Sequence, residues 1–158
     1  MVPGFKKLSE SQYQATKDAL VWITVLIAGA DGEIDEKETN WAEKITQIRG
    51  YHNPNSLTAF YDEVGHSFSE DLTDFIKRAP SDVQERSELI VRKLTQLNDI
   101  LGLLDNDLAY ELYSSYQSFA EHIAKASGGF LGFMRVNSDE EKFLNLPMIN
   151  EIILEEEE

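Results

Sequence analysis

Hydrophobic residues recur with helical spacing along almost the whole chain. The clearest stripe has steps of four, three, four and three residues and consists of Ile90, Leu94, Leu97, Leu101 and Leu104. This spacing places all five side chains on one face of a helix, and such a face normally packs against a core. Ser81 follows a break at Ala79-Pro80 and is predicted to cap this helix, with Gln84 completing a capping box.

The same pattern predicts several other helices. One begins at Ser9, which forms a capping box with Gln12, and ends near Ala30. Others are predicted, in chain order, over 35–49, 56–64, 69–78 and from 105 or 106 to about 127. The last of them carries one apolar face made of Leu108, Leu112, Tyr116, Phe119 and Ile123.

The segment from Ala19 to Ala30 is the most apolar stretch, and Thr24 is its one polar side chain. It is shorter than the roughly 18 residues that a membrane-spanning helix needs, so we expect no transmembrane segment. No stretch alternates with period two over more than a few residues, which argues against strands. The prediction is an all-α fold: a single compact bundle of about six to seven helices around a buried central helix.

Composition sets the broad class of the protein. The chain has 158 residues, 42% of them hydrophobic, and no cysteine. We therefore expect one domain over residues 1–158, with an N-terminal arm at 1–8 and an acidic tail at 155–158. The first residues lack the apolar core of a signal peptide, and no disulfide can form, so the expected location is cytoplasmic.

The charge narrows the range of partners. The net charge is −15, from 29 acidic and 14 basic residues, and Glu155–Glu158 contribute four of the negative charges. Such a field repels nucleic-acid phosphates and anionic lipids, so no nucleic-acid partner is expected. It favours cations or basic protein surfaces, although the same charge also serves solubility alone.

The most informative motif joins the first two predicted helices and reads Ala-Asp-Gly-Glu-Ile-Asp-Glu-Lys-Glu over 30–38. Asp35 is placed to cap the second helix, with Glu38 as its partner, so the motif could be a well-capped corner only. However, Asp31 follows the negative end of a helix, and several carboxylates share one turn. A divalent cation would relieve this crowding, and oxygen ligands favour calcium or magnesium over zinc. An EF-hand is excluded, because Ile27 and Gly29 fall where oxygen ligands would be required.

A second, degraded copy of this motif follows the last predicted helix. Residues 124–128 again end a helix with small residues and a glycine, and 138–141 again begin an acidic helix. The two corners raise the possibility of two degenerate, pseudo-symmetric halves.

The helix ending in Ala-Asp-Gly-Glu-Ile-Asp, with Glu38 three residues further on, resembles the tellurite-resistance TerB-like family. The resemblance is tightest over Leu20 to Ile48. It implies an all-helical module of chemical-stress responses, with acidic corners that hold a metal ion. The ligands that it implies are Asp31, Glu33, Asp35 and Glu38 in the first corner, and Glu141 with Asp139 or Glu140 in the second. Ser127 departs from the family pattern, since an aspartate is expected there.

Two other functions compete with cation binding. The first is a metal-independent protein-interaction adaptor that uses the acidic face and the loop Phe130–Met134. The second is a hydrolytic enzyme with metal-held water, which we do not expect, because the chain offers no histidine near the candidate metal ligands. The chain also has no phosphate-binding loop, no His-Glu-x-x-His and no nucleophile-elbow motif. Glu63 and His66 have the Glu-x-x-His spacing of di-iron carboxylate proteins, which we interpret as chance. We expect Trp22 and Trp41 to be core residues. The sequence leaves the oligomeric state open.

Overall fold

The computed structural model describes the chain except for residues 31, 35, 52–55, 127–141 and 156–158. Five long helices occupy most of the described part: α1 (Glu10–Ala28), α2 (Glu36–Tyr51), α3 (Thr58–Arg78), α4 (Val83–Leu101) and α5 (Asn106–Ala126). Residues 142–144 form a sixth, short helical stretch, and the described residues contain no strand. The predicted all-α class is therefore confirmed.

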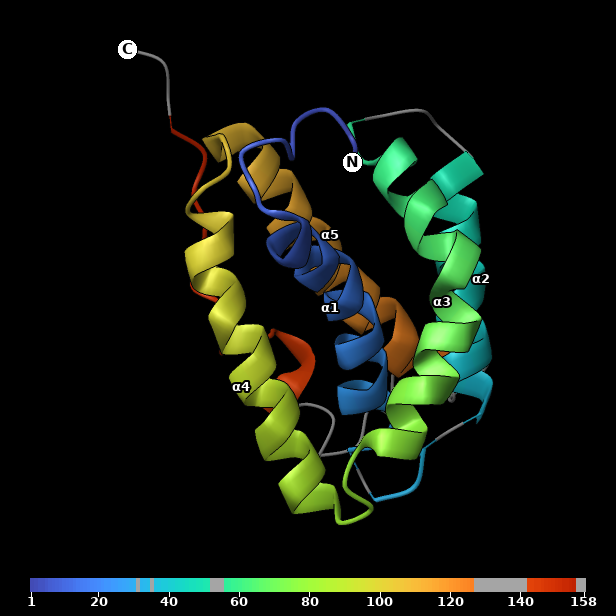
Figure 1. Ribbon diagram of the computed structural model, residues 1–158. Helices are drawn as coiled ribbons and strands as arrows, with labels where there is room; N and C mark the ends of the chain where they lie inside the picture. The colour runs from blue at the N-terminus through green and yellow to red at the C-terminus, as the bar shows by residue number, and fades with distance from the viewer. Residues whose placement is uncertain (31, 35, 52–55, 127–141, 156–158) are drawn as a thin grey trace.

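Helix α1 lies in the middle of the bundle, and the other four long helices pack around it (Figure 1). Its second half is buried from Ala19 to Ala28 except at Trp22, which packs partly buried against the core. The prediction of a buried central helix is thus confirmed. Among the described residues, no helix combines the length and the apolar character that crossing a bilayer requires.

The beginning of the chain is part of the core. Phe5 is 1% exposed, and its ring stacks on that of Phe60 from α3 at a centroid distance of 5.2 Å. Ser9 then begins α1 with the predicted capping box, in which the Ser9 side chain accepts from the Gln12 amide and Gln12 bonds the Ser9 amide. The N-terminal arm therefore ties α1 to α3.

The structure corrects two details of the predicted helices. The two short helices expected over 56–64 and 69–78 are one continuous helix, α3, because its buried stripe runs through the expected gap. That stripe consists of Phe60, Val64, Phe68 and Leu72. The N-cap of α4 is Asp82 rather than Ser81, since the Asp82 carboxylate accepts from the Glu85 amide at 2.9 Å.

Small residues let α2 and α3 approach closely. A side chain at Gly50 of α2 would lie 2.9 Å from the Asp62 backbone of α3, and Gly65 of α3 lies against Thr46 of α2. The face of α2 that turns inward is therefore the one with small residues, Ala42 and Thr46, together with Ile45. The other large apolar residues of α2, Trp41, Ile48 and Tyr51, are left exposed.

The segment after residue 144 docks along α4 and α5. The Asn98 side chain donates to the Met148 carbonyl at 3.1 Å and accepts from the Asn150 amide at 2.8 Å. Asn106 makes the same pair of bonds with the Ile153 carbonyl and the Glu155 amide, at 3.1 and 2.9 Å. The backbone from residue 150 to 155 is thus held without being helical.

Candidate functional site

The end of α1 already has a cation of its own. The Arg86 side chain, from the first turn of α4, is 5% exposed and donates through Nη2 to the Gly29 carbonyl at 2.9 Å. A guanidinium at a helix C-terminus satisfies a free carbonyl and offsets the negative end of the helix dipole. The Arg86 guanidinium therefore offsets part of the negative charge for which a bound cation was predicted. Sequence reasoning missed Arg86, although it lies four residues before Ile90 and so extends the core-facing stripe of α4.

The two described members of the first predicted metal site differ in burial. Glu33 is exposed in the turn, whereas Glu38 is 1% exposed in the first turn of α2. The other four predicted ligands, Asp31, Asp35, Asp139 and Glu141, lie outside the described residues, as does the loop Phe130–Met134. Within the described part of the chain, no three His, Asp or Glu side chains gather closely enough to hold a metal ion. The metal site stays a prediction.

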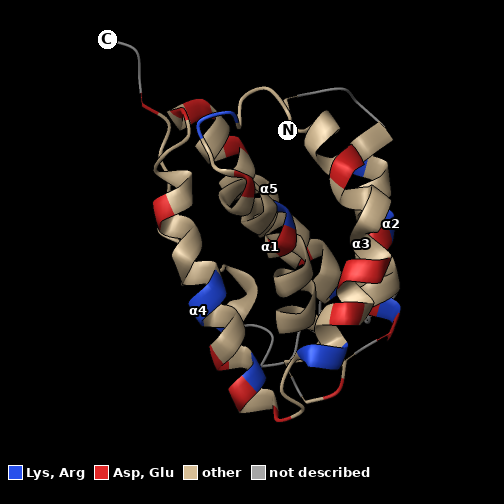
Figure 2. Cartoon of the chain, in the orientation of Figure 1, with Lys and Arg blue, Asp and Glu red and all other residues tan. Residues whose placement is uncertain are grey.

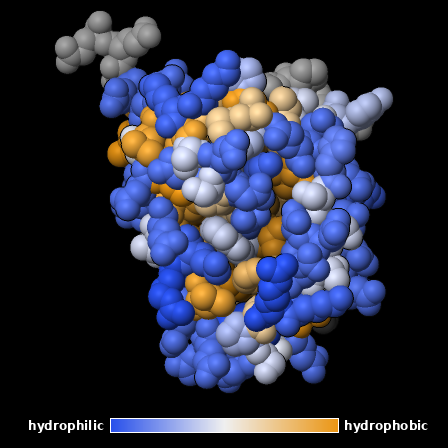
Figure 3. All heavy atoms as spheres, viewed as in Figure 1, coloured by the Kyte–Doolittle hydropathy of each residue, from blue (hydrophilic) through white to orange (hydrophobic). Residues whose placement is uncertain are grey.

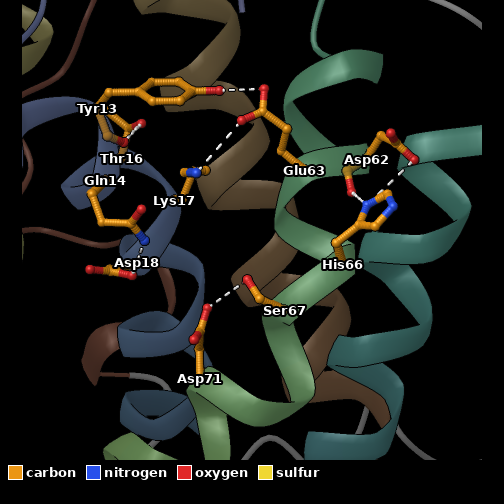
Figure 4. A network of polar contacts seen from close by, with 10 residues as sticks. All are labelled: Tyr13, Gln14, Thr16, Lys17, Asp18, Asp62, Glu63, His66, Ser67 and Asp71. Carbon is orange, nitrogen blue, oxygen red and sulfur yellow. Dashed lines mark hydrogen bonds and ion pairs between the residues drawn. The ribbon is translucent and has the colours of Figure 1, made fainter. Parts of the chain in front are cut away.

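A second group of carboxylates lies where α1 meets α3 (Figure 4). Glu63 accepts from the Tyr13 hydroxyl at 2.9 Å and lies 3.6 Å from the Lys17 ammonium. Asp18 accepts from Gln14. Burial is the main cause that raises the pKa of Asp18 above its usual value, with a further contribution from the nearby Asp71. The contacts of Glu63 join α3 to α1, whereas the Asp18 hydrogen bond lies within α1, and both have a structural role.

The histidine in this region points elsewhere. His66 Nδ1 lies 2.6 Å from the carbonyl of Asp62, on its own helix, while Glu63 turns toward α1 (Figure 4). Glu63 and His66 thus engage different partners, which agrees with the interpretation of their spacing as chance. Figure 2 shows that acidic positions are spread over several helices rather than gathered at one end of the bundle.

The outward side of α2 carries a third and different kind of surface. Its residues follow the same steps of four, three, four and three as the core stripe of α4, and they are Lys37, Trp41, Lys44, Ile48 and Tyr51. We call these five residues the α2 outer stripe. Trp41, Ile48 and Tyr51 are 36, 40 and 81% exposed. Large apolar groups aligned on an exposed helix face are unusual, because a soluble domain normally buries such a stripe.

The exposure of Trp41 corrects the expectation that it is a core residue. The small-residue face of α2 is the one that packs on α3, and this turns the Trp41 indole outward. The Lys44 ammonium lies 5.3 Å from the centre of the Trp41 ring, so the stripe combines an aromatic face with a positive charge. Trp22 keeps its predicted role in part, since it packs against the core.

One arginine fixes α2 in place. Arg49 donates through Nη1 to the Tyr61 hydroxyl at 2.8 Å and to the Ser115 carbonyl at 3.0 Å, and through Nη2 to the Ser118 hydroxyl at 2.8 Å. Its guanidinium also lies 5.7 Å from the ring centre of Phe119. A single side chain thereby ties α2 to both α3 and α5, which sets the orientation of the outer stripe.

Two hollows border the stripe. The one on the α5 side has a volume of about 630 Å³, and its described lining is Lys37, Asn40, Trp41, Lys44, His122, Lys125 and Ala126. The one on the α3 side has a volume of about 510 Å³ and includes Ile48, Tyr51, Tyr61 and His66. Lys44 lines both of them.

The described lining of the hollow on the α5 side has three lysines and no carboxylate, although the chain as a whole is strongly acidic. One of these lysines, Lys125, is ion-paired with Glu121 at 2.9 Å, so its charge is partly offset within the chain. The pKa of His122 is lowered, first by burial and then by the positive charge of Arg49, and this favours the uncharged imidazole. The stripe and this hollow together form a surface that is both apolar and basic.

Comparisons with protein-family models, with curated proteins and with solved structures gave no match to the chain.

Proposed function

We propose that this protein is a non-enzymatic interaction module that binds a partner protein through the α2 outer stripe. The observation that carries the proposal is the exposure of Trp41, Ile48 and Tyr51 along one line of a helix whose other face is packed. Aromatic and aliphatic side chains in such a line offer apolar area that a partner can remove from water. Each 100 Å² removed contributes about 2.5 kcal/mol before the costs of association.

The residue types and the rigidity of the stripe support the proposal. Tryptophan and tyrosine are the residues most often found at the centres of protein interfaces. The stripe lies on a helix that Arg49 fixes to two neighbours, so little conformational entropy is lost when a partner binds. The hollows on both sides offer places for side chains of the partner, as in complexes where an amphipathic helix lies in a groove.

The proposal retains the adaptor function expected from the sequence but places the binding surface on α2. The sequence suggested an adaptor that uses the acidic face and the loop Phe130–Met134. The described part of the structure instead offers the α2 outer stripe, which combines apolar and basic residues.

A displayed library of random 15-residue peptides tests the proposal. Peptides enriched on the wild type are expected to lose at least about tenfold in affinity for Trp41→Ala and Ile48→Asp, as is usual for central interface residues. Leu103→Asp is the matched control, because Leu103 is 46% exposed at a site away from the α2 outer stripe. This variant should bind the enriched peptides with the affinity of the wild type. Enriched peptides that bind both stripe variants as tightly as the wild type would refute the proposal.

A second candidate function is divalent-cation binding at the acidic corner, in a stress response of the kind the TerB-like resemblance implies. The observation that favours it is the burial of the Glu38 carboxylate in a turn that is rich in acidic residues. Calorimetric titration with calcium, magnesium, manganese and zinc tests it, on the wild type and on Asp31→Asn/Asp35→Asn. Heat that the double variant lacks supports this candidate, and no heat with any of the four ions removes it.

A further inference from the structure

Most of the exposed large hydrophobic side chains lie at two places on the molecule. The described residues include seven of them, of which three belong to the α2 outer stripe and two, Ile153 and Leu154, to the C-terminal segment, while Met1 and Leu103 lie apart from the stripe. Ile153 is 70% and Leu154 is 44% exposed. In Figure 3, hydrophobic atoms reach the surface at the upper left, beside this segment.

The backbone at Ile153 and Leu154 is fixed. Asn106, at the start of α5, bonds the Ile153 carbonyl and the Glu155 amide on either side of Leu154. The two apolar side chains are therefore presented to solvent from an extended, tethered backbone. A segment held in this way loses little conformational entropy when a partner covers it.

Both places are apolar, and the charges beside them have opposite signs. Ile153-Leu154 is followed by Glu155–Glu158, so apolar residues are followed directly by four carboxylates. The α2 outer stripe adjoins a hollow that three lysines line: Lys37, Lys44 and Lys125. We infer that the partner of the stripe is a second copy of this chain, whose segment Ile153–Glu158 places its apolar residues on Trp41 and Ile48 and its glutamates toward these lysines. The inference rests on the function proposed above.

The contact has to be made between copies. The segment is tethered at Asn106, whereas Lys125 lies nineteen residues further along the same helix, about 28 Å away at 1.5 Å per residue. The three residues after Glu155 span at most about 10 Å, so they do not reach the hollow of their own chain. Figure 1 likewise shows the C-terminal segment and α2 on opposite sides of the bundle.

Apolar contact supplies most of the binding energy in this arrangement. Exposed lysine–carboxylate pairs contribute roughly 0–1 kcal/mol each, so they fix the direction of the segment more than its affinity. The net charge of −15 opposes association, but at physiological salt this repulsion is screened over about 8 Å. Because the two surfaces differ, a dimer made by one such contact leaves one surface of each kind open. The mean mass should therefore rise beyond that of the dimer with concentration, either to a closed ring or to a growing chain of copies.

Two variants test the inference by sedimentation velocity. The stripe variant Trp41→Ala/Ile48→Asp keeps its C-terminal segment, and the tail variant Ile153→Asp/Leu154→Asp keeps its stripe. All four positions are exposed, and circular dichroism is used to check that both variants fold. Each variant alone should be monomeric at concentrations where the wild type and Leu103→Asp associate. An equimolar mixture should form a one-to-one dimer and nothing larger, because it contains one intact pair of surfaces.

A charge exchange tests the basic hollow separately. Lys37→Glu/Lys44→Glu should weaken association by at least about tenfold, an effect expected when like charges face each other across a contact. Lys6→Glu/Lys77→Glu changes the net charge equally, at exposed sites outside the stripe, and should weaken it less than threefold. Equal effects of the two pairs would show that only net charge matters and would overturn the assignment of the hollow.

The outcomes separate this inference from the proposed function. A wild type that is monomeric at several hundred micromolar overturns the second-copy inference. If library peptides still bind the wild type and not the stripe variant, the proposed function stands. Self-association that survives in the stripe variant, together with peptides that do not need the stripe, overturns both.

Discussion

Replacing Arg49 tests how α2 is held against the rest of the bundle. Arg49→Met keeps an apolar stem of similar length and removes the guanidinium with its three hydrogen bonds, to Tyr61, Ser115 and Ser118. A hydrogen bond to a charged group contributes about 1.5–3 kcal/mol when it is counted alone. The simple sum for three such bonds overstates the effect, because the remaining groups keep other partners.

Those other partners are visible in the structure. The Tyr61 hydroxyl also donates to Ser115 Oγ at 2.9 Å, and the Ser118 hydroxyl donates to the Ser115 carbonyl at 3.1 Å. Arg49 is also only partly buried, so water can replace some of what is lost. We expect Arg49→Met to lower the free energy of unfolding by about 2–4 kcal/mol. For a domain of this size, that corresponds to a fall in melting temperature of roughly 4–16 °C.

Urea unfolding followed by far-ultraviolet circular dichroism measures this loss. Arg92→Met is the matched control, because Arg92 is exposed on α4, and it should change the free energy of unfolding by less than about 0.5 kcal/mol. Hydrogen exchange should show that amide protection in α2 falls more than in α4. A loss below about 1 kcal/mol, or one equal to that of the control, would refute the role of Arg49 as the anchor of α2.

Substitutions at three positions test other parts of the account. Ile48→Asp should lower the free energy of unfolding in urea by no more than about 2 kcal/mol, since Ile48 is 40% exposed and only part of its side chain is buried in the monomer. A loss above about 3 kcal/mol would mean that the stripe packs within the monomer. Asp18→Asn should raise the melting temperature at pH 7, because the Asp18 carboxyl has a folded pKa above its usual value of 3.8 and so destabilises the fold as pH rises through the folded pKa. The gain in melting temperature should vanish below about pH 3.8, where the carboxyl is protonated in both states. A melting temperature that is unchanged or lowered at pH 7 would contradict the raised pKa. Leu94→Ala should cost about 2–5 kcal/mol in urea unfolding and Leu94→Met less than about 1.5, because Leu94 is fully buried, and equal losses would argue against a tightly packed site.

Local patterns predicted much of the fold. The stripe of α4 and the apolar second half of α1 are buried as expected, and the Ser9–Gln12 capping box has both of its hydrogen bonds. Each of these signals lies within one or two helical turns, where side-chain spacing and capping chemistry decide the structure. The continuity of α3 was missed, because the small residues around Gly65 resemble a break until they are seen against Thr46 of α2.

The orientation of α2 could not be predicted from spacing. Its outer stripe and the core stripe of α4 have the same steps of four, three, four and three residues, yet one is exposed and the other is buried. The close approach of α2 to α3 at Gly50 and Gly65 selects the small-residue face for the interior. Which helices approach each other so closely is a property of the tertiary structure, so the sequence pattern led us to expect Trp41 in the core.

The candidate metal site shows a different limit of sequence reasoning. The crowding of carboxylates at the first corner was interpreted as an electrostatic demand for a bound cation. No pattern in the sequence indicated a positive side chain near the end of α1, because Arg86 lies about fifty residues further along the chain. Its guanidinium reaches Gly29 only when α4 packs against α1.

Collisional quenching of Trp41 fluorescence tests the central claim most directly. In a Trp22→Phe background, Trp41 is the one remaining indole of the chain, and acrylamide should quench it readily in the free protein, because it is 36% exposed. Adding a peptide selected on the wild type should reduce the quenching constant severalfold, with a midpoint that matches the dissociation constant of the peptide. If the peptide binds and the quenching of Trp41 stays unchanged, the outer stripe of α2 is not the binding surface.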